Sequence, residues 1–295
     1  MKIGFNGSFP LYENLKELQI NKTNCFAPIS TLERELATLV KQLAAIDDLQ
    51  KKIEKSGVQW DVDNNYQDTL LNLIESVDKF YDIAYLLIRN TSDINDGEEI
   101  TNAIDWAKKY ENKKYGILSA IKSDHEWIRK ISNLKKHDDV RIGFFNMTTE
   151  AENTVYGFFF GTIKNEIFTP NLEIHRPYNG MKTGFSYNRF INQLVTHILR
   201  IIKELNKSLF NGANKNQGLP CNDMQKIINF LHINKPIYFP DEYSIKMTAI
   251  KKEKNSYSLK FIKGSYTERF SSMNLTMMVK NQGNKGSYIP YMGSA

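Results

Sequence analysis

The stretch Ser30–Gly57, "STLERELATLVKQLAAIDDLQKKIEKSG", decides the fold of the N-terminal half. Its leucines and isoleucines recur at steps of three and four residues, which places them on one side of an α-helix. Ser30 and Glu33 have the spacing of a capping box, and Gly57 ends the pattern. The stretch therefore predicts one long amphipathic helix with a single buried stripe.

Three further helical regions follow the first. Residues 64–89 repeat the same apolar spacing, and the short polar connection before them makes this helix an antiparallel neighbour of the first. A third region covers about 98–137, with a break expected near Gly116 or Asp124. A last long helix is expected over 186–211, where an Asn-Gly pair ends the pattern. Together they predict an up-and-down helical bundle.

Residues 140–175 interrupt the helices with short aromatic and β-branched runs that are separated by polar turns. This composition predicts a β-hairpin or meander inserted before the last helix. The run "VYGFFFGTI", 155–163, has two interpretations: its rings pack in the core, or they form a platform on which bases stack. Core packing is preferred, because large exposed apolar patches are rare on monomers.

The stretch "NGANKNQGLP", 211–220, has almost nothing to bury and predicts a domain boundary. The expected division is a lead segment at 1–29, a bundle at 30–211, a small basic α/β region at 220–280 and a flexible tail at 281–295. The predicted fold class is α+β: a mainly helical up-and-down bundle with an inserted β-hairpin or meander and a small C-terminal α/β appendage.

The positive charge is concentrated in the C-terminal third. The chain has a formal charge of +6, yet residues 1–202 hold 25 basic and 27 acidic side chains, whereas 203–295 hold 14 basic and 6 acidic ones. This excess suits a polyanionic partner such as RNA. The alternative is a solvated surface, since an AT-rich genome also enriches lysine and asparagine.

Several classes of function lack support in the sequence. Cys25 and Cys221 are the only cysteines and lie far apart, which fits a reducing cytoplasm and suggests neither a disulfide framework nor a thiolate metal site. No apolar stretch approaches the ~18 residues of a membrane span. The phosphate-binding loop, dinucleotide, zinc-protease, hydrolase and calcium-loop motifs are missing. We therefore expect a soluble cytoplasmic protein that needs no metal or cofactor.

The strongest functional candidate is a polar stripe that ends in "SNLKKHDD", 132–139. His125, Arg129, Asn133 and His137 fall within about 120° on a helical wheel, opposite a row of isoleucines. We expect this stripe to face away from the core of its own bundle. The alternative is an ordinary wet helix end, where lysine and histidine suit the helix dipole.

The stripe has the residue types that metal-independent RNA cleavage needs. A histidine can act as general base on a ribose 2′-hydroxyl or as general acid toward the leaving oxygen. An arginine can stabilise the phosphorane charge, and an asparagine can orient either group. The catalytic candidates are therefore Arg129, Asn133 and His137.

A helical bundle with Arg129, Asn133 and then Lys136-His137 near the end of a late helix resembles the HEPN superfamily. The resemblance covers about residues 30–210. It implies a homodimer, and for many members it implies RNA cleavage in bacterial defence and toxin systems through an Arg-(four to six residues)-His motif. Seven residues stand between Arg129 and His137, which is longer than that spacing. Catalytically silent members with Asn-x-x-Lys-His would look similar.

Other basic residues are candidates for binding. Lys136 and His125 belong to the stripe, although the acidic neighbours of His125 also suit an exposed turn. His175 and Arg176 end a strand and would have to meet the stripe in space. His197 falls on the buried side of the last helix and is expected to be an interior, hydrogen-bonded residue.

Two functions remain open. The first is a HEPN-like cytoplasmic protein of bacterial defence or toxin type, acting as a metal-independent endoribonuclease with the stripe in an inter-subunit groove. The second is a non-catalytic module that binds a protein or nucleotide partner, in which the stripe only packs. The long spacing from arginine to histidine favours the second.

Overall fold

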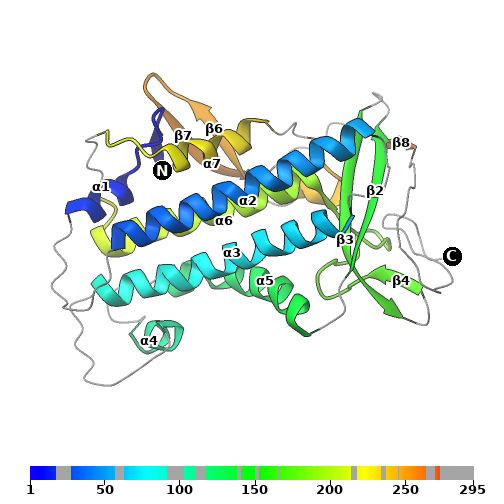
Figure 1. Cartoon of the computed structure of the whole chain (residues 1–295), viewed down its shortest axis with the longest axis horizontal. Coiled ribbons are helices and arrows are strands. Elements are labelled where there is room, and N and C mark those ends of the chain that lie inside the picture. The colour runs from blue at the N-terminus through cyan, green and yellow to red at the C-terminus, as the bar shows by residue number, and fades with distance from the viewer. Residues whose placement is uncertain are drawn as a thin grey trace.

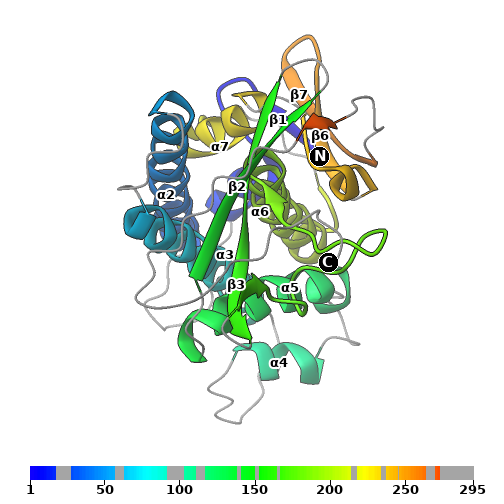
Figure 2. The ribbon, with the colours of Figure 1, turned by 90° about the vertical axis from the view of Figure 1, so that its right-hand side faces the viewer.

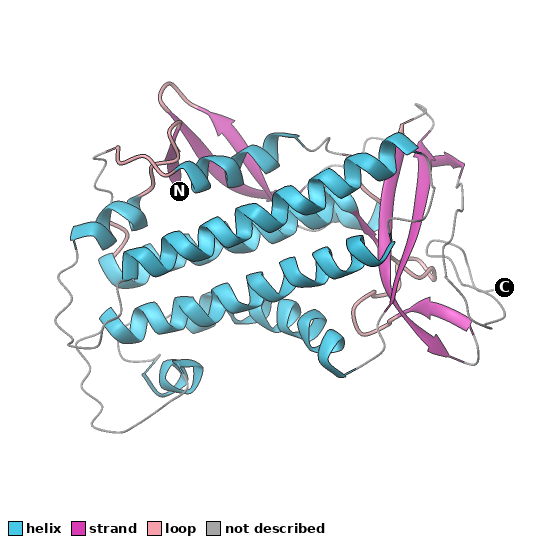
Figure 3. Cartoon of the chain, in the orientation of Figure 1, coloured by secondary structure: helices cyan, strands magenta, loops and turns pink. Residues whose placement is uncertain are grey.

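The computed structural model describes residues 1–17, 28–56, 63–91, 103–110, 117–137, 141–149, 153–164, 167–213, 218–233, 237–244, 246–263 and 270–272. Helices fill the middle of the molecule, and strands lie at one end and along one side (Figure 1, Figure 3). The predicted α+β class with a mainly helical bundle is confirmed.

The bundle is built around α3, Asp63–Thr91. This helix packs against α2, Pro28–Ser56, and against α4, α5 and α6, which span Ala103–Tyr110, Ile117–His137 and Tyr187–Phe210. In Figure 1, α2 and α3 run side by side along the molecule. The bundle expected from the apolar spacing is therefore present.

The ends of α6 follow the sequence signals. Ser186 is the N-cap, and its side-chain oxygen accepts a hydrogen bond from the backbone N–H of Arg189. Asn211 closes the helix in the left-handed conformation, with φ of 51°. The predicted break at Asp124 is wrong, because this residue lies inside α5. The region of the alternative break at Gly116 is outside the described residues.

A five-stranded antiparallel sheet stands at one end of the bundle (Figure 2). Its strands are β2, Arg141–Thr149; β3, Thr154–Lys164; β4, Ile167–Pro170; β5, Phe185–Ser186; and β8, Phe270–Ser272. The order is β4-β3-β2-β8, and β5 also pairs with β3. The predicted meander is thus confirmed as β2, β3 and β4, and it is extended by two short strands from elsewhere in the chain.

Both faces of this sheet are covered. Phe158 and Phe160 contact Phe190 of α6, with ring centroids 5.1 and 6.3 Å apart, whereas Phe159 belongs to a separate aromatic cluster with Phe145 and others. Alternation along a strand sends neighbouring side chains to opposite faces. All three phenylalanines of β3 are buried, so the core-packing interpretation is confirmed.

Glycines make room for the second aromatic cluster. A Cβ atom at Gly157 would lie 2.3 Å from the ring of Phe239, and one at Gly143 would lie 2.3 Å from the ring of Phe159. The rings therefore lie directly over backbone that has no side chain. Phe239 reaches the sheet from the segment before a short 3-10 helix, Pro240–Ser244, and stacks on Phe145 at 4.7 Å.

The C-terminal region packs on the same core. Helix α7, Asn222–Ile233, contacts α2 and α6, and its Met224, Ile227 and Ile228 belong to the bundle's hydrophobic cluster. The domain boundary predicted near residue 211 stays a prediction. The tail at 281–295 lies outside the described residues.

A second sheet pairs the first strand of the chain with a hairpin from its last third. Strand β1, Lys2–Gly4, pairs antiparallel with β7, Ser256–Lys263, which pairs with β6, Lys246–Lys252. Helix α1, Pro10–Glu17, packs against α6. The N-terminal lead segment therefore contributes a strand and a helix to the folded structure. None of the described helices is both long and apolar enough to cross a membrane.

Candidate functional site

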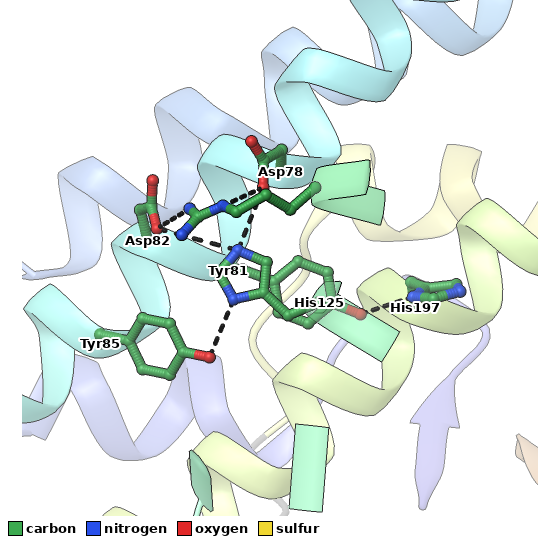
Figure 4. A network of polar contacts seen from close by, with 7 residues as sticks. Asp78, Tyr81, Asp82, Tyr85, His125 and His197 are labelled. Carbon is green, nitrogen blue, oxygen red and sulfur yellow. Dashed lines mark hydrogen bonds and ion pairs between the residues drawn. The ribbon is translucent and has the colours of Figure 1, made fainter. Parts of the chain in front are cut away.

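His125 lies at the centre of a polar network between α5 and α3 (Figure 4). Its Nε2 donates to Oδ1 of Asp78 at 3.1 Å, since a carboxylate can only accept. Its Nδ1 is 3.0 Å from the hydroxyl of Tyr85, which then donates. The imidazole also stacks on Tyr81, with centroids 4.5 Å apart and planes 5° from parallel. The ring is thus held on both edges and on one face.

Arg129 extends the same network toward the surface. Its Nε donates to Oδ1 of Asp78 at 3.3 Å, and its Nη2 donates to Oδ1 of Asp82 at 2.8 Å. Burial alone would raise the pKa of Asp78, but the hydrogen bond from His125 and the charge of Arg129 outweigh it and hold that pKa below its ordinary value. The two carboxylates therefore act as fixed acceptors on α3.

The network continues to α6. The hydroxyl of Tyr81 pairs with Nδ1 of His197 at 2.5 Å. Trp127 stacks on the imidazole of His197, with ring centroids 5.5 Å apart. Burial lowers the pKa of His197 to about 3, so its imidazole is neutral. The prediction of an interior, hydrogen-bonded histidine is confirmed. An ion pair between Asp124 and Arg200 links α5 to α6 nearby.

The prediction that the stripe faces away from its own bundle is wrong for two of its members. His125 is buried, and Arg129 is directed to the carboxylates of α3. A helical wheel gives the direction of each side chain around one helix, but it does not show which neighbouring helix lies in that direction. Asp78, Tyr81, Asp82 and Tyr85 were missed as site residues. The sequence feature that could have revealed them is a pair of aspartates and a pair of tyrosines on the adjacent helix, with the two members of each pair four residues apart.

The far end of the stripe is only partly described. Asn133 is exposed on α5, one turn beyond Arg129. The side chains of Lys136 and His137 lie outside the described residues. The eight-residue step from Arg129 to His137 spans ~12 Å of helix axis.

His175 and Arg176 lie in the turn after β4. Nε2 of His175 accepts the backbone N–H of Phe160 at 2.9 Å, and its buried ring packs against Phe185, with centroids 4.6 Å apart. Burial lowers the pKa of His175 to about 3. Arg176 is exposed, and its carbonyl oxygen accepts the hydroxyl of Thr183 at 2.9 Å. His175 thus contacts the sheet through Phe160 and Phe185, and the network of His125 is built from other residues.

A second buried acid holds the segment before β6 against α6. Glu242 accepts the backbone N–H of Ser186 at 2.9 Å, the hydroxyl of Ser186 at 2.5 Å and the N–H of Phe239 at 2.9 Å. Burial raises its pKa to about 8. The nearby charge of Arg189 acts in the opposite direction. With the carboxyl enclosed, this group fixes a chain segment and offers no access to a substrate.

The geometry of the His125 network limits its chemistry. Both ring nitrogens of His125 already have partners, so neither is free to take a proton from a substrate. Two carboxylates surround one guanidinium, which leaves a net negative charge when the imidazole is neutral. Such a group repels a phosphodiester. Within the described ranges, no cluster of three or more His, Cys, Asp or Glu side chains could hold a metal ion.

No family model, curated protein or solved structure matches the chain. The resemblance to the HEPN superfamily therefore stays a prediction.

Proposed function

We propose that the chain is a non-catalytic interaction module in which the network of Asp78, Asp82, His125 and Arg129 joins α3 to α5. One observation carries this proposal: Arg129, the catalytic candidate that would bind the phosphate, is already engaged by two carboxylates. The guanidinium of Arg129 has carboxylates at 3.3 and 2.8 Å, and His125 is bonded through both nitrogens. A phosphate would have to displace a carboxylate to reach Arg129.

An RNA-cleavage assay tests the proposal. The purified protein is incubated with mixed RNA in EDTA, and we expect no cleavage. Arg129→Ala should then act only as a packing variant, lowering the free energy of unfolding by roughly 1 kcal/mol, because its ion pairs are half exposed. Lys130→Ala, at the adjacent and more exposed position, is the matched control. Cleavage that is lost in Arg129→Ala and kept in Lys130→Ala would refute the proposal.

A second candidate is a cytoplasmic, metal-independent endoribonuclease of bacterial defence or toxin type that acts as a homodimer. The observation that favours it is the position of Arg129 and Asn133, which both reach the surface of α5 on adjacent turns. In this candidate, Arg129 of one subunit and His137 of the other act on one phosphate in a groove between the subunits.

Mixing two inactive variants tests this candidate. If the groove combines Arg129 of one subunit with His137 of the other, Arg129→Ala and His137→Ala should each be inactive. A mixture of the two variants should regain part of the activity, because mixed dimers contain one intact groove. Light scattering shows whether dimers form. A monomeric wild type, or a mixture as inactive as its components, would eliminate the dimer-groove model.

A further inference from the structure

A small cavity lies where α2 and α3 meet the five-stranded sheet, at the end of the bundle where these helices approach β2 and β3 in Figure 1. Gln50 of α2 and Tyr66 of α3 line it from the bundle, and β2 and β3 line it from the sheet. Ile53 and Tyr156 also border it and are partly exposed, so the cavity reaches the surface beside them. Its free space is about 10 Å³, which holds one group of the size of a water molecule.

The sheet side of the cavity is formed by four side chains on one face. The register pairs Phe144 with Phe158 and Asn146 with Tyr156. Residues opposite each other, or two apart on one strand, share a face. The ring of Tyr66 lies 5.0 Å from that of Phe144 and 6.3 Å from that of Phe158, with the planes 83° and 63° apart. Aromatic rings therefore enclose the cavity from the sheet and from α3.

One buried polar group at this cavity has no partner among the described residues. Asn146 is 7% exposed, and its side chain makes no hydrogen bond to any of them. The other amide is engaged, because Gln50 accepts the hydroxyl of Tyr66 at 3.3 Å and donates to Oε1 of Glu54 at 3.3 Å. Buried amides are nearly always hydrogen-bonded, since an unpaired one has lost its contacts with water. The amide of Asn146 is therefore available to a group that enters the cavity.

The charge beside the cavity is negative. Glu54 is exposed one turn beyond Gln50, and no ion pair of Glu54 is found in the described part of the chain. Burial raises the pKa of Tyr156, and the charge of Glu54 raises it further, so this carboxylate lies near the mouth. Lys51 of α2 is engaged by Asp47, with Nζ and Oδ2 2.5 Å apart. An anion would be repelled here and a cation attracted.

We propose that the cavity binds a primary ammonium group carried on an alkyl chain. The ammonium fills the water-sized space, donates a hydrogen bond to Oδ1 of Asn146 and is attracted by the surrounding rings and by Glu54. The alkyl chain leaves past Ile53. A trimethylammonium group or a nucleobase is larger than the space, and a water molecule has no charge for the rings to attract. The cavity is separate from the His125 network, so the inference holds under either proposed function.

Isothermal titration calorimetry of the full-length protein with n-butylammonium chloride tests the proposal. We expect one site with a Kd of about 1 mM, an affinity that a ligand of about five non-hydrogen atoms can reach. The neutral analogue n-butanol has the same chain, and it should bind at least tenfold more weakly, because it lacks the charge. Equal affinities for the two ligands would refute a cation site. No saturable heat with butylammonium at about 50 mM would mean that the cavity holds water only, and it overturns the proposal.

A variant of the unpartnered amide locates the site. Asn146→Leu has a similar volume without polar atoms, so its melting temperature should be no lower than that of the wild type. Its affinity for butylammonium should fall at least tenfold, since a hydrogen bond to a charged group is lost. Asn229→Leu is the same change at an exposed position of α7 and should bind as the wild type does. Equal weakening in both variants would refute the site.

A variant at the mouth separates charge from packing. Glu54→Gln should weaken butylammonium binding about threefold, the size of an exposed charge interaction, and leave butanol binding unchanged. Glu126→Gln makes the same change of net charge on α5, where the side chain is 66% exposed, and it should bind as the wild type does. Equal losses in both variants would show a diffuse charge effect and contradict the role of Glu54.

Two further ligands distinguish the sources of the ammonium group. Spermidine is a free polyamine, whereas Nα-acetyl-lysine methylamide represents a lysine side chain of a partner protein. Tighter binding of spermidine assigns the cavity to polyamines, and tighter binding of the lysine analogue assigns it to a protein partner. Binding of neither ligand would overturn the proposal.

Discussion

Replacing Asp78 by alanine should destabilise the protein by about 3 kcal/mol. The largest part comes from His125, whose buried Nε2–H loses its acceptor, and a hydrogen bond to a charged group contributes about 1.5–3 kcal/mol. Arg129 keeps its bond to Asp82 and is partly exposed, so its share is roughly 0.5–1 kcal/mol. We expect the loss at Asp78 to be several times that at an exposed carboxylate.

Asp82→Ala is the matched control, because it is the same change one turn along α3. The side chain of Asp82 is 46% exposed and binds Arg129 at 2.8 Å, so its loss should cost about 0.5–1 kcal/mol. Urea unfolding followed by circular dichroism measures both variants against the wild type. If the slope of the unfolding free energy against urea concentration is the same in each variant as in the wild type, the substitution changed the stability of the native state and not the compactness of the denatured state.

The pH dependence provides an independent check on Asp78. Its pKa in the folded protein is below the ordinary value, so its stabilising contribution is complete above about pH 4 and is lost as the pH falls through the folded pKa. The difference between the wild type and Asp78→Ala should therefore shrink in acid. Equal destabilisation by Asp78→Ala and Asp82→Ala at neutral pH would refute the reasoning that the buried His125 bond dominates.

Three further predictions concern other parts of the molecule. Gly157→Ala should cost about 1–3 kcal/mol, because its Cβ would lie 2.3 Å from the ring of Phe239, and a melting temperature equal to the wild type's would contradict this packing. His175 and His197 have pKa values lowered to about 3, so the folded state binds fewer protons than the unfolded one and stability should fall as the pH drops from 6.5. Glu242 has a pKa raised to about 8, so it should lower stability as the pH rises from about 4.5 to 8, and Glu242→Gln should flatten that decline in a pH series of thermal melts.

The long elements of the fold could be predicted from the sequence because their signals are local. The apolar spacing of residues 30–57 and the Asn211-Gly212 end of the last helix act within a few turns of chain. Strands β1 and β8 were not predicted. Each has three residues, and its identity depends on a partner far away in the chain. Such pairing leaves no periodic trace in so short a segment.

In the candidate site too, local features could be predicted from the sequence and long-range contacts could not. The angular grouping of His125 and Arg129 was correct, and the burial of His197 followed from its place among apolar residues of α6. The role of the group depended on Asp78 and Asp82, which are about fifty residues earlier in the chain. A wheel of one helix cannot show that the opposing helix supplies carboxylates.

The pairing of β1 with β7 has a consequence for synthesis. Lys2 leaves the ribosome before the helical bundle, whereas its partner Ser258 is made only after the bundle. Closing so long a loop is slow, and domains fold from the N-terminus as they emerge. Strand β1 therefore stays unpaired while the bundle assembles. In prematurely terminated chains, which lack β7, its edge remains unpaired.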